Sequence, residues 1–200
     1  MVKLTIDGIQ VEAEKGTSVL HAAESVGIKI PTLCYIKDLL PDGSCRMCMV
    51  EIESRGRTKM ETACTAQVAE GLVVTTNSEK VRNARRNILD MLLSNHKTDC
   101  FSCPSNGDCK LQELCFEYGI ERTTYSGEQT ELPIDDSNKF FTYNPNLCIL
   151  CHRCVNTCHK IVGRGAIDTM ERGFDSAIGT PFHIDWADTN CESCGNCVQA

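Results

Sequence analysis

Cysteine is the residue type that most constrains what this chain can fold into. Fifteen of its 200 residues are cysteines, and most stand in short groups. So many thiols either close a disulfide scaffold or hold metal. The first residues, MVKLTIDGIQ, lack the charged and apolar regions of a secretory signal, so we expect a cytoplasmic protein with reduced thiols. The odd cysteine count also disfavours closed disulfides, and metal binding is the better interpretation.

The remaining composition excludes several classes of function. The formal net charge is −7, from 27 acidic and 20 basic residues, which leaves no basic surface for nucleic acid. No run of about 18 apolar residues is present, so we expect no membrane span. No serine–histidine or carboxylate pair stands out as catalytic. We therefore expect no catalytic residues, and no cofactor other than what the cysteines hold.

The most specific motif is the run CILCHRCVNTC at 148–158. Its four cysteines have the spacing C-x2-C-x2-C-x3-C and are Cys148, Cys151, Cys154 and Cys158. This spacing is typical of 4Fe–4S proteins, and its fourth cysteine ligates a second cluster. The run CESCGNCVQA at 191–200 repeats the first three positions, as Cys191, Cys194 and Cys197.

The repeat predicts two 4Fe–4S clusters with crossed ligands. One cluster takes Cys158 together with Cys191, Cys194 and Cys197. The other takes Cys148, Cys151 and Cys154, and the repeat puts its fourth ligand one position beyond Ala200. We therefore expect a longer protein truncated before its last cysteine, with a foreign ligand as the alternative. Zinc is the competing metal, but zinc ribbons use paired hooks rather than triple-cysteine runs.

Two further groups complete the ligand sets. His96, Cys100, Cys103 and Cys109 follow a predicted helix with the spacing H-x3-C-x2-C-x5-C, and histidine can replace cysteine in iron–sulfur sites. Alone, His96 would more often be a helix C-terminal residue. The second group suits a 2Fe–2S cluster, with zinc as the alternative. It has the spacing C-x10-C-x2-C-x15-C and contains Cys34, Cys45, Cys48 and Cys64.

Hydrophobic periodicity predicts the elements around these groups. We expect a hairpin over 2–13 with a turn at Asp7-Gly8, and a helix that Thr17 or Ser18 caps and that ends at Gly27. Short strands are expected at 49–52 and 72–74, and helices over 78–95 and 109–118. A connecting segment covers 121–138. We expect the arginines of the longer helix to face solvent and the leftover Cys115 to be a buried free thiol.

The order of these motifs resembles the N-terminal iron–sulfur module shared by three groups of enzymes. They are molybdopterin-dependent formate dehydrogenase catalytic subunits, iron-only hydrogenases, and the large iron–sulfur subunit of respiratory complex I. Matching stretches run the length of the chain: IPTLCY at 30–35, GSCRMCMVEIE at 43–53, TACTAQVAEG at 62–71, HKTDCFSCPSNGDCKLQ at 96–112, and the two ferredoxin-type runs.

The resemblance implies an α+β protein in three parts. Residues 1–77 would form a β-grasp 2Fe–2S domain, and 78–138 a helical 4Fe–4S segment with one histidine and three cysteine ligands, followed by the connector. Residues 139–200 would form a bacterial-ferredoxin-like domain for two 4Fe–4S clusters. The resemblance thus implies one 2Fe–2S and three 4Fe–4S clusters.

The implied function is the relay of single electrons within a larger oxidoreductase. The stretch RGFDSAIGTPF at 172–182 favours a formate dehydrogenase, with an iron-only hydrogenase or an NADH dehydrogenase subunit as the alternative. A structural zinc protein is the second alternative. The expected partners are other redox subunits, such as a flavin- and NAD(P)H-linked or ferredoxin-linked diaphorase. A molybdopterin or hydrogen cluster would lie only beyond residue 200.

Overall fold

The computed structural model describes residues 1–128 and 131–200. The chain divides into two compact units that do not follow simple chain order. The first unit contains Met1–Tyr35, Leu40–Leu89 and Lys110–Glu121, and the second contains Ile36–Leu39, Asp90–Cys109 and Arg122–Ala200. Domain boundaries near 77 and 138 stay predictions. Residues 129–130 of the expected connector lie outside the described residues.

A five-stranded mixed sheet forms the body of the first unit, in the order β2-β1-β5-β3-β4. Its strands are β1 (Val2–Ile6), β2 (Ile9–Ala13), β3 (Met49–Ser54), β4 (Arg57–Thr62) and β5 (Leu72–Thr75). β1 pairs antiparallel with β2 and parallel with β5, while β3 pairs antiparallel with both β4 and β5. The expected hairpin over 2–13 is therefore confirmed.

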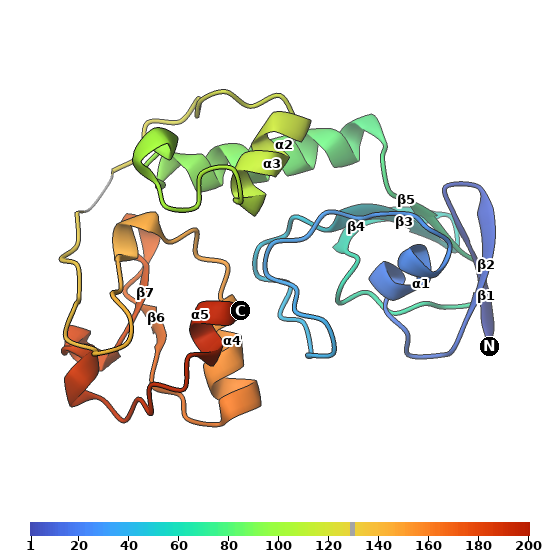
Figure 1. The fold of residues 1–200 in the computed structure, drawn as a ribbon. Coiled ribbons are helices and arrows are strands. Elements are labelled where there is room, and N and C mark those ends of the chain that lie inside the picture. The colour runs from blue at the N-terminus through green and yellow to red at the C-terminus, as the bar shows by residue number, and fades with distance from the viewer. Residues whose placement is uncertain (129–130) are drawn as a thin grey trace. The chain divides into compact units, whose positions relative to one another are not determined.

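Helix α1 (Val19–Ser25) lies against this sheet, as Figure 1 shows. Its N-cap is Ser18, whose hydroxyl accepts a hydrogen bond from the His21 backbone N–H at 3.2 Å, as expected for a serine at a helix start. The core between helix and sheet contains Leu20 of α1 with Ile6, Val50 and Val74 of the strands, all at most 1% exposed. The helix packed across a mixed sheet is the β-grasp arrangement that the family resemblance implied.

Strand β4 was not predicted from the sequence. It follows a turn at Arg55-Gly56, where both residues have positive φ values of 51° and 72°. Such a pair forms a tight turn whose twist suits a β-hairpin. The strand that follows reads RTKMET and has little apolar alternation, because its position in the sheet order is at the edge.

Helices α2 (Glu79–Ser94) and α3 (Lys110–Glu117) confirm the two longer helical predictions. Ser78 caps α2, since its hydroxyl accepts the Val81 N–H at 3.1 Å. The expectation that the arginines of α2 face solvent is wrong for one of them. Arg85 is only 3% exposed, and its guanidinium reaches the Tyr118 hydroxyl, beyond the end of α3.

The second unit is built around a small apolar core rather than a large sheet. Val155, Ile167, Ile178 and Trp186 form that core. Its two strands are β6 (Asp168–Met170) and β7 (Ala177–Gly179), which pair antiparallel. Helix α4 (Arg153–Asn156), a π-helical turn over Thr157–Val162 and helix α5 (Asn196–Gln199) carry several of the cysteines.

The fold is therefore α+β, with a β-grasp sheet domain followed by helical and loop segments. Within the described parts of the chain, none of the helices has the length and apolar character needed to cross a membrane. All fifteen cysteines are described, and none of them forms a disulfide.

Candidate iron–sulfur sites

The first candidate site lies where two loops of the first unit meet the sheet. Cys34 and Cys45 belong to the loop after α1, Cys48 immediately precedes β3, and Cys64 follows β4 closely. Three of the four thiols are buried, and Cys45 is half-buried. The strands thus position two of the four ligand candidates, and the loop from Cys34 to Cys48 brings the others.

The structure brings these four thiols together as two close pairs. The Sγ atoms of Cys48 and Cys64 are 3.3 Å apart, and the thiol of Cys45 hydrogen-bonds to the thiol of Cys34. In a 2Fe–2S group each iron is held by two cysteines. The two pairs therefore have the arrangement that such a group requires.

Within each pair one thiol is readily deprotonated. The hydrogen bond from Cys45 lowers the pKa of Cys34 to about 5, and the bond from Cys64 lowers the pKa of Cys48 to about 7. The same bonds and burial raise the pKa values of Cys45 and Cys64. Because the thiolate is the form that binds iron, each pair offers one ligand that is already in its binding form near neutral pH.

Gly43 lets the ligand loop approach the segment before Cys64. Its φ is +64°, and a Cβ built there would lie 3.1 Å from Thr65 Cγ2 and 3.3 Å from Thr62 Oγ1. A residue with a side chain would be strained in conformation and crowded at the same time. Glycine is therefore required where the loop passes over these threonines.

The second candidate site contains His96, Cys100, Cys103 and Cys109, all in the second unit between α2 and α3. The His96 side chain is partly buried, which lowers its pKa and favours the neutral imidazole that binds metals, although a hydrogen bond to the Cys148 backbone raises it slightly. Cys100 begins a short 3₁₀ turn (Cys100–Ser102), and the Cys103 N–H closes that turn on the Cys100 carbonyl at 3.2 Å.

The two ferredoxin-type runs share the same backbone conformation. Leu150 and Ser193, each two residues after the first cysteine of its run, have φ values of 52° and 53°. Their N–H groups donate to Cys148 Sγ and Cys191 Sγ at 3.3 and 3.4 Å. His152 and Gly195 then adopt positive φ immediately before α4 and α5. The sequence repeat is therefore also a structural repeat.

Cys158 and the later run line one small and largely apolar cavity of the second unit. Phe141, Ile167 and Trp186 form part of its wall. The four thiols at this cavity are those of Cys158, Cys191, Cys194 and Cys197. They are the same four that crossed pairing assigns to one 4Fe–4S cluster, so the donors fit that group.

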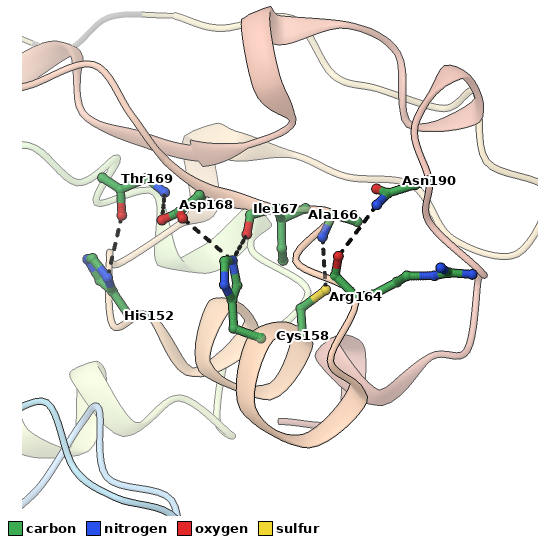
Figure 2. A network of polar contacts seen from close by, with 9 residues as sticks. His152, Cys158, Arg164, Ala166, Ile167, Asp168, Thr169 and Asn190 are labelled. Carbon is green, nitrogen blue, oxygen red and sulfur yellow. Dashed lines mark hydrogen bonds and ion pairs between the residues drawn. The ribbon is translucent and has the colours of Figure 1, made fainter.

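Figure 2 shows the polar contacts that hold Cys158 in place. The Ala166 N–H donates to Cys158 Sγ at 3.3 Å, and the Arg164 N–H donates to the Cys158 carbonyl at 3.0 Å. The His159 ring, on the residue after Cys158, donates from Nε2 to the Ile167 carbonyl at 2.9 Å and lies 3.5 Å from the Asp168 carboxylate. The segment over 164–168 therefore folds back over the ligand.

In the run of Cys148, Cys151 and Cys154, the first and last cysteines pack against the same core. Burial raises the pKa of Cys154 to about 12, and the charges of Cys148 and Cys151 add to that shift. Deprotonation of one of these thiols is therefore disfavoured when the other two are charged. Iron would relieve this repulsion, because a bound metal favours the deprotonated thiol.

The described residues contain no group of three or more histidine, cysteine or acidic side chains gathered tightly enough for one metal ion. The ligands of a 4Fe–4S cluster stand farther apart than those of a single ion, because each binds a different iron of the cage. The wider spacing of the cysteine sets is therefore compatible with clusters.

Several features of these sites were not predicted from the sequence. The thiol pairing around Cys34 and Cys48, the crowding at Gly43 and the buried Arg85 depend on contacts between distant segments. Gly43 could have been found as a glycine within a ligand loop, since glycine often marks close backbone approach. The backbone donors to sulfur carry no side-chain signal at all.

Comparisons with known proteins agree with this description. Residues 1–79 match the family described as a 2Fe-2S iron-sulfur cluster binding domain. Residues 85–124 match the NADH-ubiquinone oxidoreductase-G iron-sulfur binding region. Fold and site together define an iron–sulfur protein with one 2Fe–2S domain and a 4Fe–4S binding region.

Individual relatives cover the whole chain. An NADH-quinone oxidoreductase subunit of Rhizobium meliloti is 42% identical over 201 residues, and the alpha subunit of the NADPH-Fe(3+) oxidoreductase of Geobacter sulfurreducens is 42% identical over 200 residues. The chain spans 23% of the length of each. A chain in the crystal structure of an NAD+-reducing [NiFe]-hydrogenase is 31% identical with a TM-score of 0.85, over 95% of this chain and 80% of that one.

This protein therefore belongs to the family of iron–sulfur electron-transfer modules to which that hydrogenase chain belongs. The relatives named here are subunits of NADH- or NADPH-type oxidoreductases or of a hydrogenase. They support the alternative, a hydrogenase or NADH dehydrogenase subunit, better than the preference for formate dehydrogenase, which no comparison shows.

Proposed function

We propose that this chain relays single electrons between the redox centres of a larger NADH- or NADPH-linked oxidoreductase. The observation that carries the proposal is the division of four buried or half-buried thiols into two close pairs, with 3.3 Å between Cys48 Sγ and Cys64 Sγ. Two adjacent thiol pairs suit two irons, because each iron of a 2Fe–2S cluster takes two cysteines. The repeated ferredoxin-type loops support the same function.

The proposed ligand sets are four. The 2Fe–2S set is Cys34, Cys45, Cys48 and Cys64. The first 4Fe–4S set is His96, Cys100, Cys103 and Cys109. The second 4Fe–4S set is Cys158, Cys191, Cys194 and Cys197. The third contains Cys148, Cys151 and Cys154, with a fourth ligand supplied from outside these 200 residues.

Bound clusters would supply the one-electron chemistry, and the residues of this chain bind, tune and shield them. Thiolates and one imidazole form the bonds. Backbone N–H groups at Met47, Leu150, Ala166 and Ser193 donate to cysteine sulfurs and stabilise their negative charge. The apolar wall around Cys158 limits water access, which is a further control on reduction potential.

A hydrogenase assembly is the second candidate. The structural match to an NAD+-reducing [NiFe]-hydrogenase chain favours it. In either assembly the partners would be other redox subunits, and the substrate chemistry would take place outside the described residues. The relatives do not support formate dehydrogenase, so we do not retain it as the main proposal.

Anaerobic purification of the chain tests the proposal directly. We expect a coloured protein with iron and acid-labile sulfide in equal amounts, and separate paramagnetic signals from 2Fe–2S and 4Fe–4S clusters after reduction. A colourless folded protein that contains stoichiometric zinc and no sulfide would refute electron transfer and support a structural zinc protein.

The ligand role of His96 is tested by a pair of variants. His96→Ala should lose about four irons per chain and one 4Fe–4S signal, because one corner of a cluster loses its ligand, while the 2Fe–2S signal stays. Cys115→Ala is the matched control, since Cys115 is a buried thiol outside every proposed set. Equal iron contents in the two variants would refute the assignment of His96.

A further inference from the structure

Arg85 is a buried cation in the first unit. Its side chain is 3% exposed, although arginine is rarely buried unless it is paired. One guanidinium nitrogen, Nη2, donates to the Met49 carbonyl at 2.7 Å, and the other, Nη1, donates to the Tyr118 hydroxyl at 3.0 Å. Both partners are neutral, so neither cancels the charge.

No other partner of Arg85 supplies a negative charge. Among residues 1–128 and 131–200, no carboxylate lies within ion-pair distance of its guanidinium, and its buried Nε atom has no hydrogen-bond partner. A buried charge without compensation is strongly unfavourable. The position of Arg85 therefore requires a negative charge close by that is not a carboxylate.

The proposed 2Fe–2S ligands supply that charge. Met49, whose carbonyl binds Arg85, directly follows Cys48. Standard covalent geometry, added to the hydrogen-bond length, limits the distance from Nη2 to Cys48 Sγ to about 12 Å. Four thiolates around two irons form a net anion, and reduction adds one further negative charge.

We infer that Arg85 is an electrostatic tuning residue that raises the reduction potential of the 2Fe–2S site. The inference rests on the proposed 2Fe–2S ligand set. A buried positive charge stabilises the reduced, more negative state more than the oxidised state. Loss of that charge must therefore make the one-electron reduction less favourable.

Coulomb's law gives the size of the effect. One unit charge at about 12 Å, with an effective dielectric constant of about 20, changes the ratio of reduced to oxidised cluster about tenfold. For a one-electron couple, a tenfold change is about 59 mV. A shorter distance or a lower dielectric constant would make the change larger.

The test is a redox titration of the 2Fe–2S paramagnetic signal in the anaerobically purified full chain. Arg85→Gln removes the charge but keeps a side-chain donor. It should lower the ratio of reduced to oxidised 2Fe–2S cluster about tenfold at a fixed potential. Arg86→Gln is the control, because Arg86 is the adjacent and exposed arginine of α2; its guanidinium donates to the Tyr118 carbonyl, so this variant also reports the loss of a hydrogen bond to Tyr118 without loss of a buried charge. Its ratio should change less than about twofold, since water and salt screen exposed charges.

A third variant separates charge from structural support. Tyr118→Phe removes one of the two neutral hydrogen-bond partners of Arg85 and keeps the charge, so it should lower the thermal stability without the tenfold shift in the ratio of reduced to oxidised cluster. If Arg85 only supports the fold, Arg85→Gln would lower the thermal stability as Tyr118→Phe does. The midpoint potential of the 2Fe–2S cluster would then be the same in Arg85→Gln and Arg86→Gln. That result would overturn the inference.

A charge-retaining variant covers the case in which Arg85→Gln does not hold its cluster. Arg85→Lys should then keep the wild-type ratio within about twofold, and a tenfold fall in the Lys variant would overturn the inference. A wild-type chain that gives no 2Fe–2S signal would instead refute the ligand set. A wild-type 2Fe–2S signal whose midpoint potential is the same in the Arg85→Gln variant would refute the tuning role alone.

Discussion

Gly43→Ala should weaken the 2Fe–2S site selectively. Gly43 lies in the ligand loop two residues before Cys45, with φ at +64°. The added methyl would meet Thr65 Cγ2 at 3.1 Å and Thr62 Oγ1 at 3.3 Å. Both threonines stand just before Cys64 or directly after it, so any displacement reaches both thiol pairs.

The matched control is Gly71→Ala. Gly71 has nearly the same φ, +71°, but nothing lies within 4 Å of the added Cβ. Both substitutions force alanine into the left-handed region, which costs about 1–2 kcal/mol. Only Gly43→Ala adds the crowding term, typically about 1–3 kcal/mol when extra atoms enter a packed region. The difference between the variants is therefore at least about 1 kcal/mol.

The assay is the loss of the visible 2Fe–2S absorbance in excess chelator at 25 °C. If the native loop must open before iron leaves, 1 kcal/mol of strain speeds cluster loss about fivefold. We expect Gly43→Ala to release its 2Fe–2S cluster at least that much faster than Gly71→Ala. Both variants lose stability through the shared backbone term, and only Gly43→Ala loses more through crowding. Equal release rates would refute the role assigned to the close approach of the loop.

Two further predictions concern stability. Ser78→Ala removes the N-cap of α2 and the hydrogen bond that chiefly lowers the pKa of Glu51, at a cost of about 1–2 kcal/mol at pH 7. Because Glu51 has a folded pKa below its unfolded value, its stabilisation is present above about pH 4.3 and is lost as pH falls through the folded pKa. The difference in the free energy of unfolding between wild type and Ser78→Ala should therefore be smaller in acid than at pH 7. A difference that does not change with pH would contradict this prediction. Trp186→Ala should destabilise the second unit by about 3–5 kcal/mol and release the cluster at Cys158, whose cavity Trp186 lines; iron analysis that shows full retention would contradict this.

The sequence predicted the helices and the hairpin well because their signals are local. Ser18 and Ser78 cap helices in the structure as their positions suggested, and Asp7-Gly8 forms the expected turn between β1 and β2. Such signals lie within a few residues of the element they define. Strand β4 was missed because an edge strand need not alternate apolar and polar residues.

Arg85 was misjudged for a different reason. Helical spacing placed it beside exposed arginines, and a charged residue is normally expected in water. Its burial depends on Met49 and Tyr118, which lie 36 and 33 residues away in the chain. Sequence periodicity cannot show that two neutral acceptors from other elements will meet on one helix face.

The cysteine spacing predicted which residues could form ligand sets but not how their sulfurs are stabilised. The same local arrangement occurs after three of the cysteines, in both units. Met47 donates to Cys45, Leu150 to Cys148 and Ser193 to Cys191, each from the backbone N–H two residues along at 3.3–3.4 Å. Each arrangement contains a positive φ, at Arg46 one residue after Cys45, and at Leu150 and Ser193 two residues after their cysteines.

Backbone donors explain why such different sequences can fill these loops. The residues after the first cysteine are Arg-Met, Ile-Leu and Glu-Ser, which share no side-chain chemistry. Every residue except proline carries the N–H group that the sulfur needs. The sequence then has to supply only the cysteine spacing and a residue that can adopt left-handed backbone. That conformation costs about 1–2 kcal/mol per residue. The N–H to sulfur bonds and the iron–sulfur bonds themselves must offset that cost, so the loops should relax when iron is removed.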